Sequence, residues 1–161
     1  MDRRIQIAAV FLVLAGGFLA LLIFGLDSDE EAINGRLDDL LELAEVSGSE
    51  GKLQSLATAR RISGFFTRNC SVQILYDRSE IDGSEEITAL AASLRAQSKS
   101  VSFSLRERNL TLGGGGDRAE MNLRIKVKIA GEESIDRGEG RFFLNWVKSD
   151  GQWLIDRVAI P

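Results

Sequence analysis

Residues 119–129, AEMNLRIKVKI, carry the clearest structural pattern in this chain. Its odd-numbered residues are all apolar, and the residues between them are all polar or charged. Successive side chains of a β-strand point to opposite faces of a sheet. This period of two therefore predicts a strand with one face on a hydrophobic core and the other in water. The chain should build a sheet that is covered on one side.

Further strands are expected on both sides of this one. Residues 100–106 alternate in the same way, and a glycine-rich turn joins them to the central strand. Strands over about 134–148 and 152–160 follow, and Asp150-Gly151 is typical of the tight turn that joins such strands, because both residues accept a positive φ. The last two strands carry apolar residues on both faces, so we expect both faces to be covered there.

Three helices are predicted before these strands. The first begins at Ser28, which has the spacing of a capping box with Glu31. The second covers about 50–67 and the third about 84–97, with Ser84 as its cap, and a short strand over 70–77 and a polar turn over 78–83 separate them. The expected inward faces are Ile33, Leu37, Leu40, Leu41 and Ala44; Leu53, Leu56, Ala59, Ile62 and Phe66; and Ile87, Leu90, Ala91 and Leu94.

Composition excludes several classes of site. The chain has 161 residues, no His, one Cys and a net charge of −4. Without His there is no Ser-His-Asp triad, no Cys-His dyad and no His-dependent zinc site, and one Cys cannot form a disulfide within the chain. We expect no metal and no cofactor, and the acidic balance argues against nucleic acid as a partner.

An uncharged run over residues 7–26 is long enough to cross a bilayer as a helix. Arg3 and Arg4 precede it and acidic residues follow it, so residues 1–6 should be cytoplasmic and residues 27–161 should lie outside. The prediction is a single-pass protein of a bacterial inner membrane with its domain in the periplasm or outside. The alternative is a secreted domain released by signal cleavage.

The closing segment FLNWVKSDGQWLI, residues 143–155, combines an aromatic strand, a Lys, an Asp-Gly turn and a Trp-x-Ile strand. Together with the order of helices and strands over residues 29–161, it resembles the nuclear transport factor 2-like superfamily, which includes the SnoaL-like proteins. The resemblance implies an α+β fold in which three helices pack on a curved, mainly antiparallel sheet of four to five strands. A conical cavity would then lie between sheet and helices.

The resemblance implies either an enzyme or a binding module. Catalytic members usually use an Asp with a His or a Tyr, and this chain offers only Tyr76 as a Tyr. Asp77 and Asp156 are the acids placed to act with it. Asp77 should point away from its neighbour Tyr76 in a strand. Asp156 shares a face with Leu154 and Val158, and it is either a base in an apolar wall or the partner of Arg141 or another cation across the strands. We name no catalytic residue, and Tyr76 and Asp156 remain candidates for ligand binding.

Two other features have both a functional and a structural interpretation. Cys70 is either a nucleophile or a small buried residue, and no His is present to activate it. Arg124, Lys126 and Lys128 form a basic row on one strand face. This row is either a solvated surface or a docking surface for an acidic partner.

These observations favour a membrane-anchored, non-catalytic domain of the cell envelope that assembles with a partner protein or binds a small apolar ligand. A homodimer through the sheet is a further expectation. The alternative is an anchored SnoaL-like enzyme, an isomerase, dehydratase or cyclase, that acts on a hydrophobic molecule in the cone. A buried acid or donor pair aimed at the cavity would distinguish the two.

Overall fold

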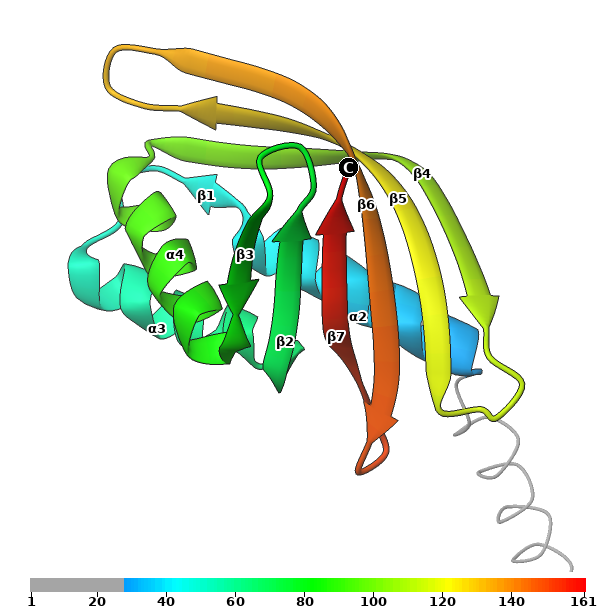
Figure 1. The fold of residues 1–161 in the computed structure, drawn as a ribbon. Helices are drawn as coiled ribbons and strands as arrows, with labels where there is room; N and C mark the ends of the chain where they lie inside the picture. The colour runs from blue at the N-terminus through cyan, green and yellow to red at the C-terminus, as the bar shows by residue number, and fades with distance from the viewer. Residues whose placement is uncertain (1–27) are drawn as a thin grey trace, which may run out of the picture.

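The computed structural model describes residues 28–161, and the predicted membrane segment 7–26 lies outside that range. Among the described residues, no helix is both long and apolar enough to cross a bilayer. The order of elements along the chain is shown in Figure 1. They are α2 (Asp29–Ala44), β1 (Val46–Ser47), α3 (Lys52–Ser63), β2 (Phe66–Ile74), β3 (Ser79–Asp82), α4 (Gly83–Gln97), β4 (Ser100–Leu112), β5 (Arg118–Ala130), β6 (Ile135–Ser149) and β7 (Gln152–Ile160).

One curled sheet holds all the described strands, in the order β1-β4-β5-β6-β7-β2-β3. Neighbours are antiparallel except for β2 and β7, which run parallel. The α+β class with three helices is confirmed, but the predicted sheet of four to five strands is wrong, because the sheet has seven. The two additional strands are short edges. β3 lies in the predicted polar turn, where Glu80 accepts hydrogen bonds from two side chains of β2, Ser71 and Gln73.

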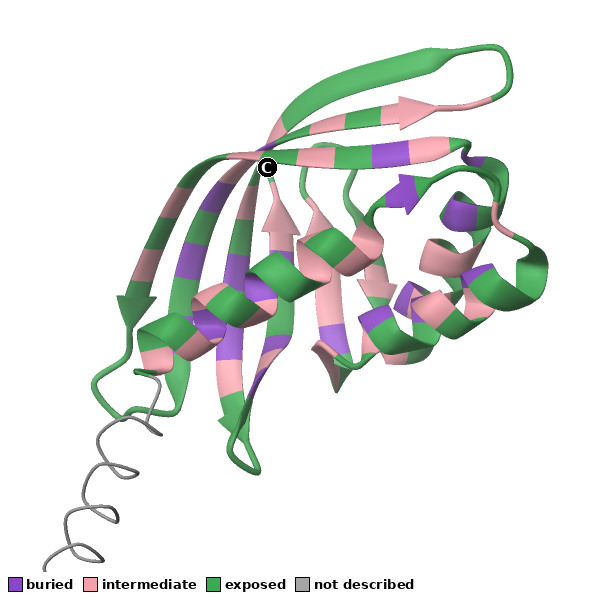
Figure 2. Ribbon diagram, turned by 180° about the vertical axis from the view of Figure 1, so that it is seen from behind, coloured by how far each residue is buried: buried purple, intermediate pink, exposed green. Residues whose placement is uncertain are grey.

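Helix α2 crosses the concave face of the sheet (Figure 2). The predicted capping box is present: the Ser28 hydroxyl accepts from the Glu31 amide, and the Glu31 carboxylate accepts from the Ser28 amide. The apolar stripe of this helix faces the sheet, with Ile33 and Leu37 fully buried in the core. Helix α2 is therefore stabilised locally by its capping hydrogen bonds and in the tertiary structure by the burial of its apolar stripe.

The predicted inward faces of the other two helices are only partly correct. Leu53 is 84% exposed, and Leu90 and Leu94 are exposed as well. Helix α4 instead buries Arg95, whose guanidinium binds the Glu50 carboxylate at 2.9 Å and donates to the last carbonyls of α2. A buried Arg needs these acceptors, and meeting them turns Leu90 and Leu94 outward.

The predicted helix boundaries also need two corrections. The second helix is shorter than the predicted 50–67, because Phe66 already belongs to β2. Ser84 does not cap the third helix: Asp82 occupies the cap position and makes no side-chain cap bond, whereas its amide donates to Glu86 at 2.8 Å. The terminal hairpin is confirmed, with positive φ at both Asp150 and Gly151.

Two β-bulges, one in β4 and one in β7, interrupt the alternation of side chains. In β4, the pairs with β5 skip Arg106, and in β7 the pairs with β6 skip Asp156. Each extra residue shifts the phase of the strand by one, so two successive side chains point to the same face. Arg106 and Glu107 are both exposed, and so are Asp156 and Arg157.

Candidate functional site

A cavity of about 240 Å³ lies between α2 and the concave face of the sheet. Every described residue that lines it has a hydrocarbon side chain. These fourteen residues are Leu37, Leu40, Leu41, Ala44, Ile62, Phe66, Phe103, Leu123, Ile125, Val127, Phe142, Leu144, Ile155 and Val158. A cavity with such a lining has no hydrogen-bonding partner to hold water and favours an apolar occupant.

The cavity follows from the two periodicities of the sequence. Leu37, Leu40, Leu41 and Ala44 of α2, with Ile62 of α3, form its helical wall. Phe66 of β2 and inward residues of β4 to β7 form the other wall. Strand β6 contributes no side chain opposite Ile125 and Val127, because its paired residues there are Gly140 and Gly138. Small residues on a concave face leave space that larger ones would fill.

Polar contacts outside the cavity lining fix α2 over this face. Asp29 Oδ1 accepts from Lys148 Nζ at 2.7 Å and from Trp153 Nε1 at 3.0 Å. Arg36 Nε donates to the Trp153 carbonyl at 3.0 Å, and Arg108 of β4 forms an ion pair with Asp38. The bulge at Arg106 turns Arg108 inward to reach the helix. Sequence reasoning missed all of these contacts, because each joins residues far apart in the chain.

The Lys148 ammonium and the Trp153 indole hold the pKa of Asp29 below its ordinary value, Lys148 having the larger effect. Donors to a carboxylate stabilise its ionised form. Asp29 is therefore charged at neutral pH, and its carboxylate joins the start of α2 to Lys148 of β6 and Trp153 of β7.

The structure places Tyr76 and Asp77 in the turn between β2 and β3, away from the cavity. Tyr76 is 75% exposed and does not line the cavity. Asp77 accepts hydrogen bonds from the Ser79 hydroxyl and amide, which lower its pKa. The predicted strand over 70–77 ends at Ile74, so the argument that these two side chains point to opposite strand faces does not apply to them.

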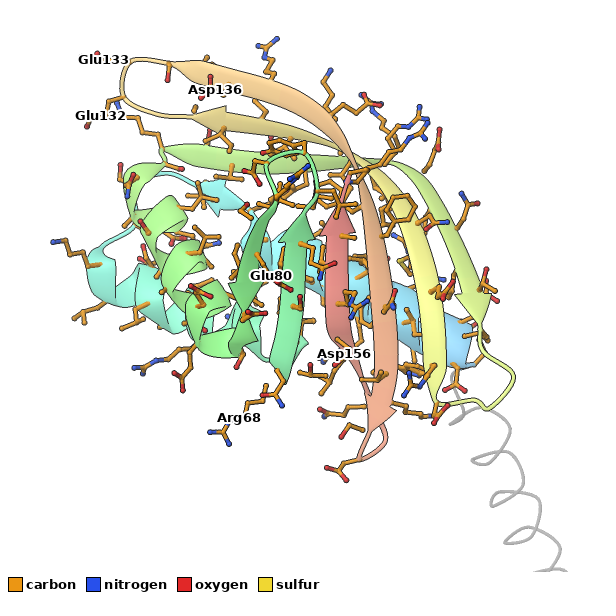
Figure 3. All side chains as sticks on the ribbon, in the orientation of Figure 1. Arg68, Glu80, Glu132, Glu133, Asp136 and Asp156 are labelled. Atoms are coloured by element: carbon orange, nitrogen blue, oxygen red, sulfur yellow. The ribbon has the colours of Figure 1, made fainter. Side chains whose placement is uncertain are left out.

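Asp156 lies on the outer face of β7, beside β2 (Figure 3). Its carboxylate accepts a hydrogen bond from the Thr67 hydroxyl at 2.9 Å. Asp156 therefore neither lies in the apolar wall nor pairs with Arg141. The bulge explains the difference: it separates Asp156 from Val158 and sends Ile155 and Val158 to the cavity together. The structure does not bring Tyr76 and Asp156 together at this site.

Cys70 is fully buried in the core, and this burial, with a smaller effect from Asp156, raises the pKa of its thiol to about 12. A thiol so protonated is a poor nucleophile at neutral pH. Trp146 Nε1 is a buried donor without a partner among the described residues, but Trp146 does not line the cavity. Within residues 28–161, no group of His, Cys, Asp and Glu could hold a metal ion.

A second, larger cleft of about 720 Å³ opens on the helical side, and charged residues such as Asp39, Glu42 and Arg61 line much of it. Its one buried cation, Arg95, already binds Glu50 and two carbonyls. Among the described residues the cleft therefore offers no unoccupied buried group, and the apolar cavity between α2 and the sheet is the better candidate site.

Known structures share this architecture. A provisionally assigned scytalone dehydratase from Novosphingobium aromaticivorans superposes with a TM-score of 0.67, at 14% identity over 82% of each chain. A nuclear transport factor 2-like protein with a cystatin-like fold, from the same organism, gives a TM-score of 0.62 at 16% identity, over 99% of this chain and 90% of the other. The chain has the nuclear transport factor 2-like fold.

Proteins with this nuclear transport factor 2-like fold include enzymes. A hexachlorocyclohexane dehydrochlorinase superposes with a TM-score of 0.64 at 13% identity, over 82% of this chain and 83% of the other. No family model and no curated protein sequence matches the chain. At such low identity the likeness is one of fold, and the same fold hosts many functions, so function has to be argued from the site.

Proposed function

We propose that this chain is a non-catalytic binding domain that takes a small, wholly apolar molecule into its cone. One observation carries the proposal: all fourteen described residues around the cavity are hydrocarbon. A catalytic cone of this kind would need an acid, a base or a donor pair directed at the reacting atoms. The two ligand-binding candidates from the sequence, Tyr76 and Asp156, do not line the cavity.

The volume limits the size of the ligand. Ligand pockets for drug-sized molecules span about 300–1,000 Å³, whereas an apolar cavity of about 150 Å³ takes up benzene. At about 240 Å³, this cavity lies between the two. The proposed ligand is therefore a neutral, mainly hydrocarbon molecule of about one to three rings or a short acyl chain, without a charged group inside the cone.

We further propose that residues 7–26 anchor the domain in a bacterial inner membrane, with residues 1–6 inside and residues 27–161 outside. The uncharged run and the preceding Arg3 and Arg4 support this arrangement. An anchored cone would sit close to the hydrocarbon phase in which apolar molecules collect. The mass of the mature N-terminus, measured in the native host, separates a retained anchor from cleavage, which would release a secreted domain.

Binding can be tested with N-phenyl-1-naphthylamine, a neutral dye whose fluorescence rises in apolar surroundings. The substitution Ala44→Phe adds a ring to the cavity wall and should abolish the increase, while the domain stays folded. The matched control is Ala89→Phe, because Ala89 is exposed on α4 and the same ring is added outside the cone. Equal fluorescence for Ala44→Phe and the parent chain would contradict the proposal.

The alternative function is an anchored SnoaL-like enzyme acting on a hydrophobic molecule. The dehydrochlorinase among the structures of this fold supports considering it. It requires a catalytic group that the described lining does not contain. Turnover of a hydrophobic substrate that is lost in Ala44→Phe, which fills the cavity wall, would favour this alternative over simple binding.

A further inference from the structure

The outer face of the sheet, opposite to the cone, carries another depression of about 320 Å³. Four cations and two hydroxyls line it, and no carboxylate of the described residues does. The lining residues, called the basic groove below, are Ser102, Ser104 and Arg106 of β4, Lys126 and Lys128 of β5, and Arg137 of β6.

Strand register brings these side chains together. Lys128 pairs with Ser102 on one side and with Arg137 on the other, and Lys126 pairs with Ser104. The β4 bulge adds Arg106 to the same face. Neighbouring strands are about 5 Å apart, and Lys126 and Lys128 are successive outward residues, about 7 Å apart along β5. The sequence showed the row on β5, but only the pairing adds cations from the neighbouring strands.

The charges of the groove are not balanced within the described part of the chain. None of its four cations forms an ion pair there. Glu107 and Glu139, the nearest acids by register, both contact Arg124, at 3.2 and 3.8 Å. Like charges placed directly opposite across strands, as Lys128 and Arg137 are, destabilise a sheet. An unbalanced basic cluster on a protein of net charge −4 favours an anionic partner.

We propose that the basic groove is the docking site for an extended acidic segment of a partner protein. Carboxylates at alternate positions of an extended chain repeat about every 7 Å, which matches the spacing of Lys126 and Lys128. The serine hydroxyls can donate to the carboxylates that the cations attract. A second copy docked symmetrically through the groove would bring cations against cations. Four cations on an acidic domain are also too few to form the basic stripe of a nucleic-acid binder.

The test uses the full chain in a neutral detergent. Its probe is a fluorescein-labelled peptide of twelve residues that alternates glutamate with serine, and binding is followed by fluorescence anisotropy. The double substitution Lys126→Gln and Lys128→Gln should weaken binding about tenfold, since it removes two of the four charges. The control is Arg60→Gln with Arg61→Gln, which removes the same charge from an exposed helix face and should leave binding unchanged.

A second peptide with the same composition, but with its glutamates in one block, tests the spacing and should bind several times more weakly. Equal weakening by both double substitutions, or no binding of the alternating peptide in low salt, would overturn the proposal. So would binding of pyrophosphate or phosphatidylglycerol vesicles through Lys126 and Lys128 when the peptide does not bind. Dye uptake by the cone should be unchanged in the groove variant, so a failure here is separate from a failure of the proposed function.

Discussion

The two faces of the sheet are built from the same strands and have opposite chemistry. On the inner face, residues such as Leu123, Ile125 and Val127 surround a cavity without a charge among its described lining residues. On the outer face, Arg124 forms ion pairs with two glutamates, while Lys126 and Lys128 form none with the described residues 28–161. A single alternating strand, β5, supplies both surfaces. The inner face is therefore suited to an apolar ligand, and the outer face is suited to an acidic segment of a partner protein.

A thiol probe should show the largest contrast between the faces. Cys70, with its pKa raised to about 12, should react about a thousandfold more slowly at pH 8 than a thiol of ordinary pKa 9.0, and burial slows it further. The variant Ser104→Cys, made in a Cys70→Ala background, should react fast because the neighbouring cations favour the thiolate. Labelling rates with iodoacetamide measure both, and fast labelling of native Cys70 would contradict the buried assignment.

Charge substitutions should depend on burial in the same way. Arg95→Met leaves Glu50 without its partner and two carbonyls without a donor, so it should lower the free energy of unfolding by about 3–5 kcal/mol. Arg137→Met on the outer face removes an exposed cation and should change it by less than about 0.5 kcal/mol. Urea denaturation measures both. Similar losses for the two variants would show that Arg95 does not hold α4 to the end of α2.

Neighbouring residues on β5 provide a sharper comparison. Leu123→Ala should cost about 2–5 kcal/mol, since Leu123 is almost fully buried on the inner face. Asn122→Ala, one residue earlier and exposed, should cost less than about 0.5 kcal/mol. Chemical denaturation of the two variants checks the side-chain alternation directly. Equal costs would mean that the register of β5 differs from the one described.

The smallest effect on stability should come from the contacts of Asp29 with Lys148 and Trp153. The pKa of Asp29 is lowered in the folded chain, so its contribution is present above the ordinary Asp pKa of 3.8 and is lost as the pH falls through the folded value. Asp29→Asn should therefore be less stable than the parent at pH 7, and the gap should close below pH 3.8. Thermal unfolding from pH 7 to pH 2.5 measures it. A gap that is constant with pH would contradict the role of the Lys148 and Trp153 contacts.

Much of the architecture was predictable from local patterns. The alternation over residues 119–129, the capping box at Ser28 and the Asp-Gly turn are all confirmed, because each depends on neighbours within a few residues. The inward faces of α3 and α4 were less predictable. Leu53, Leu90 and Leu94 look like core residues in a linear pattern, but the position of Glu50 turns α4 so that Arg95 is buried instead.

The candidate site was predictable only in its apolar character. The stripe of α2 and the inward residues of β4 and β5 indicated a hydrophobic interior. The bulge at Asp156, which separates this acid from Val158, has no marker in the sequence. The short strand β3 is similar, because its four residues lack a hydrophobic period and are held by pairing with β2.

Local sequence patterns specify which residues alternate, where the first helix begins and how the last hairpin turns, since these features depend on side-chain period, capping and backbone φ within one segment. Strand pairing and packing select which charged residues face outward together, which acid lies outside the cone and which cations have no ion-pair partner among residues 28–161. These outcomes depend on strand register and bulges. They are set by hydrogen-bonded partners many residues away, whose pairing no local pattern specifies.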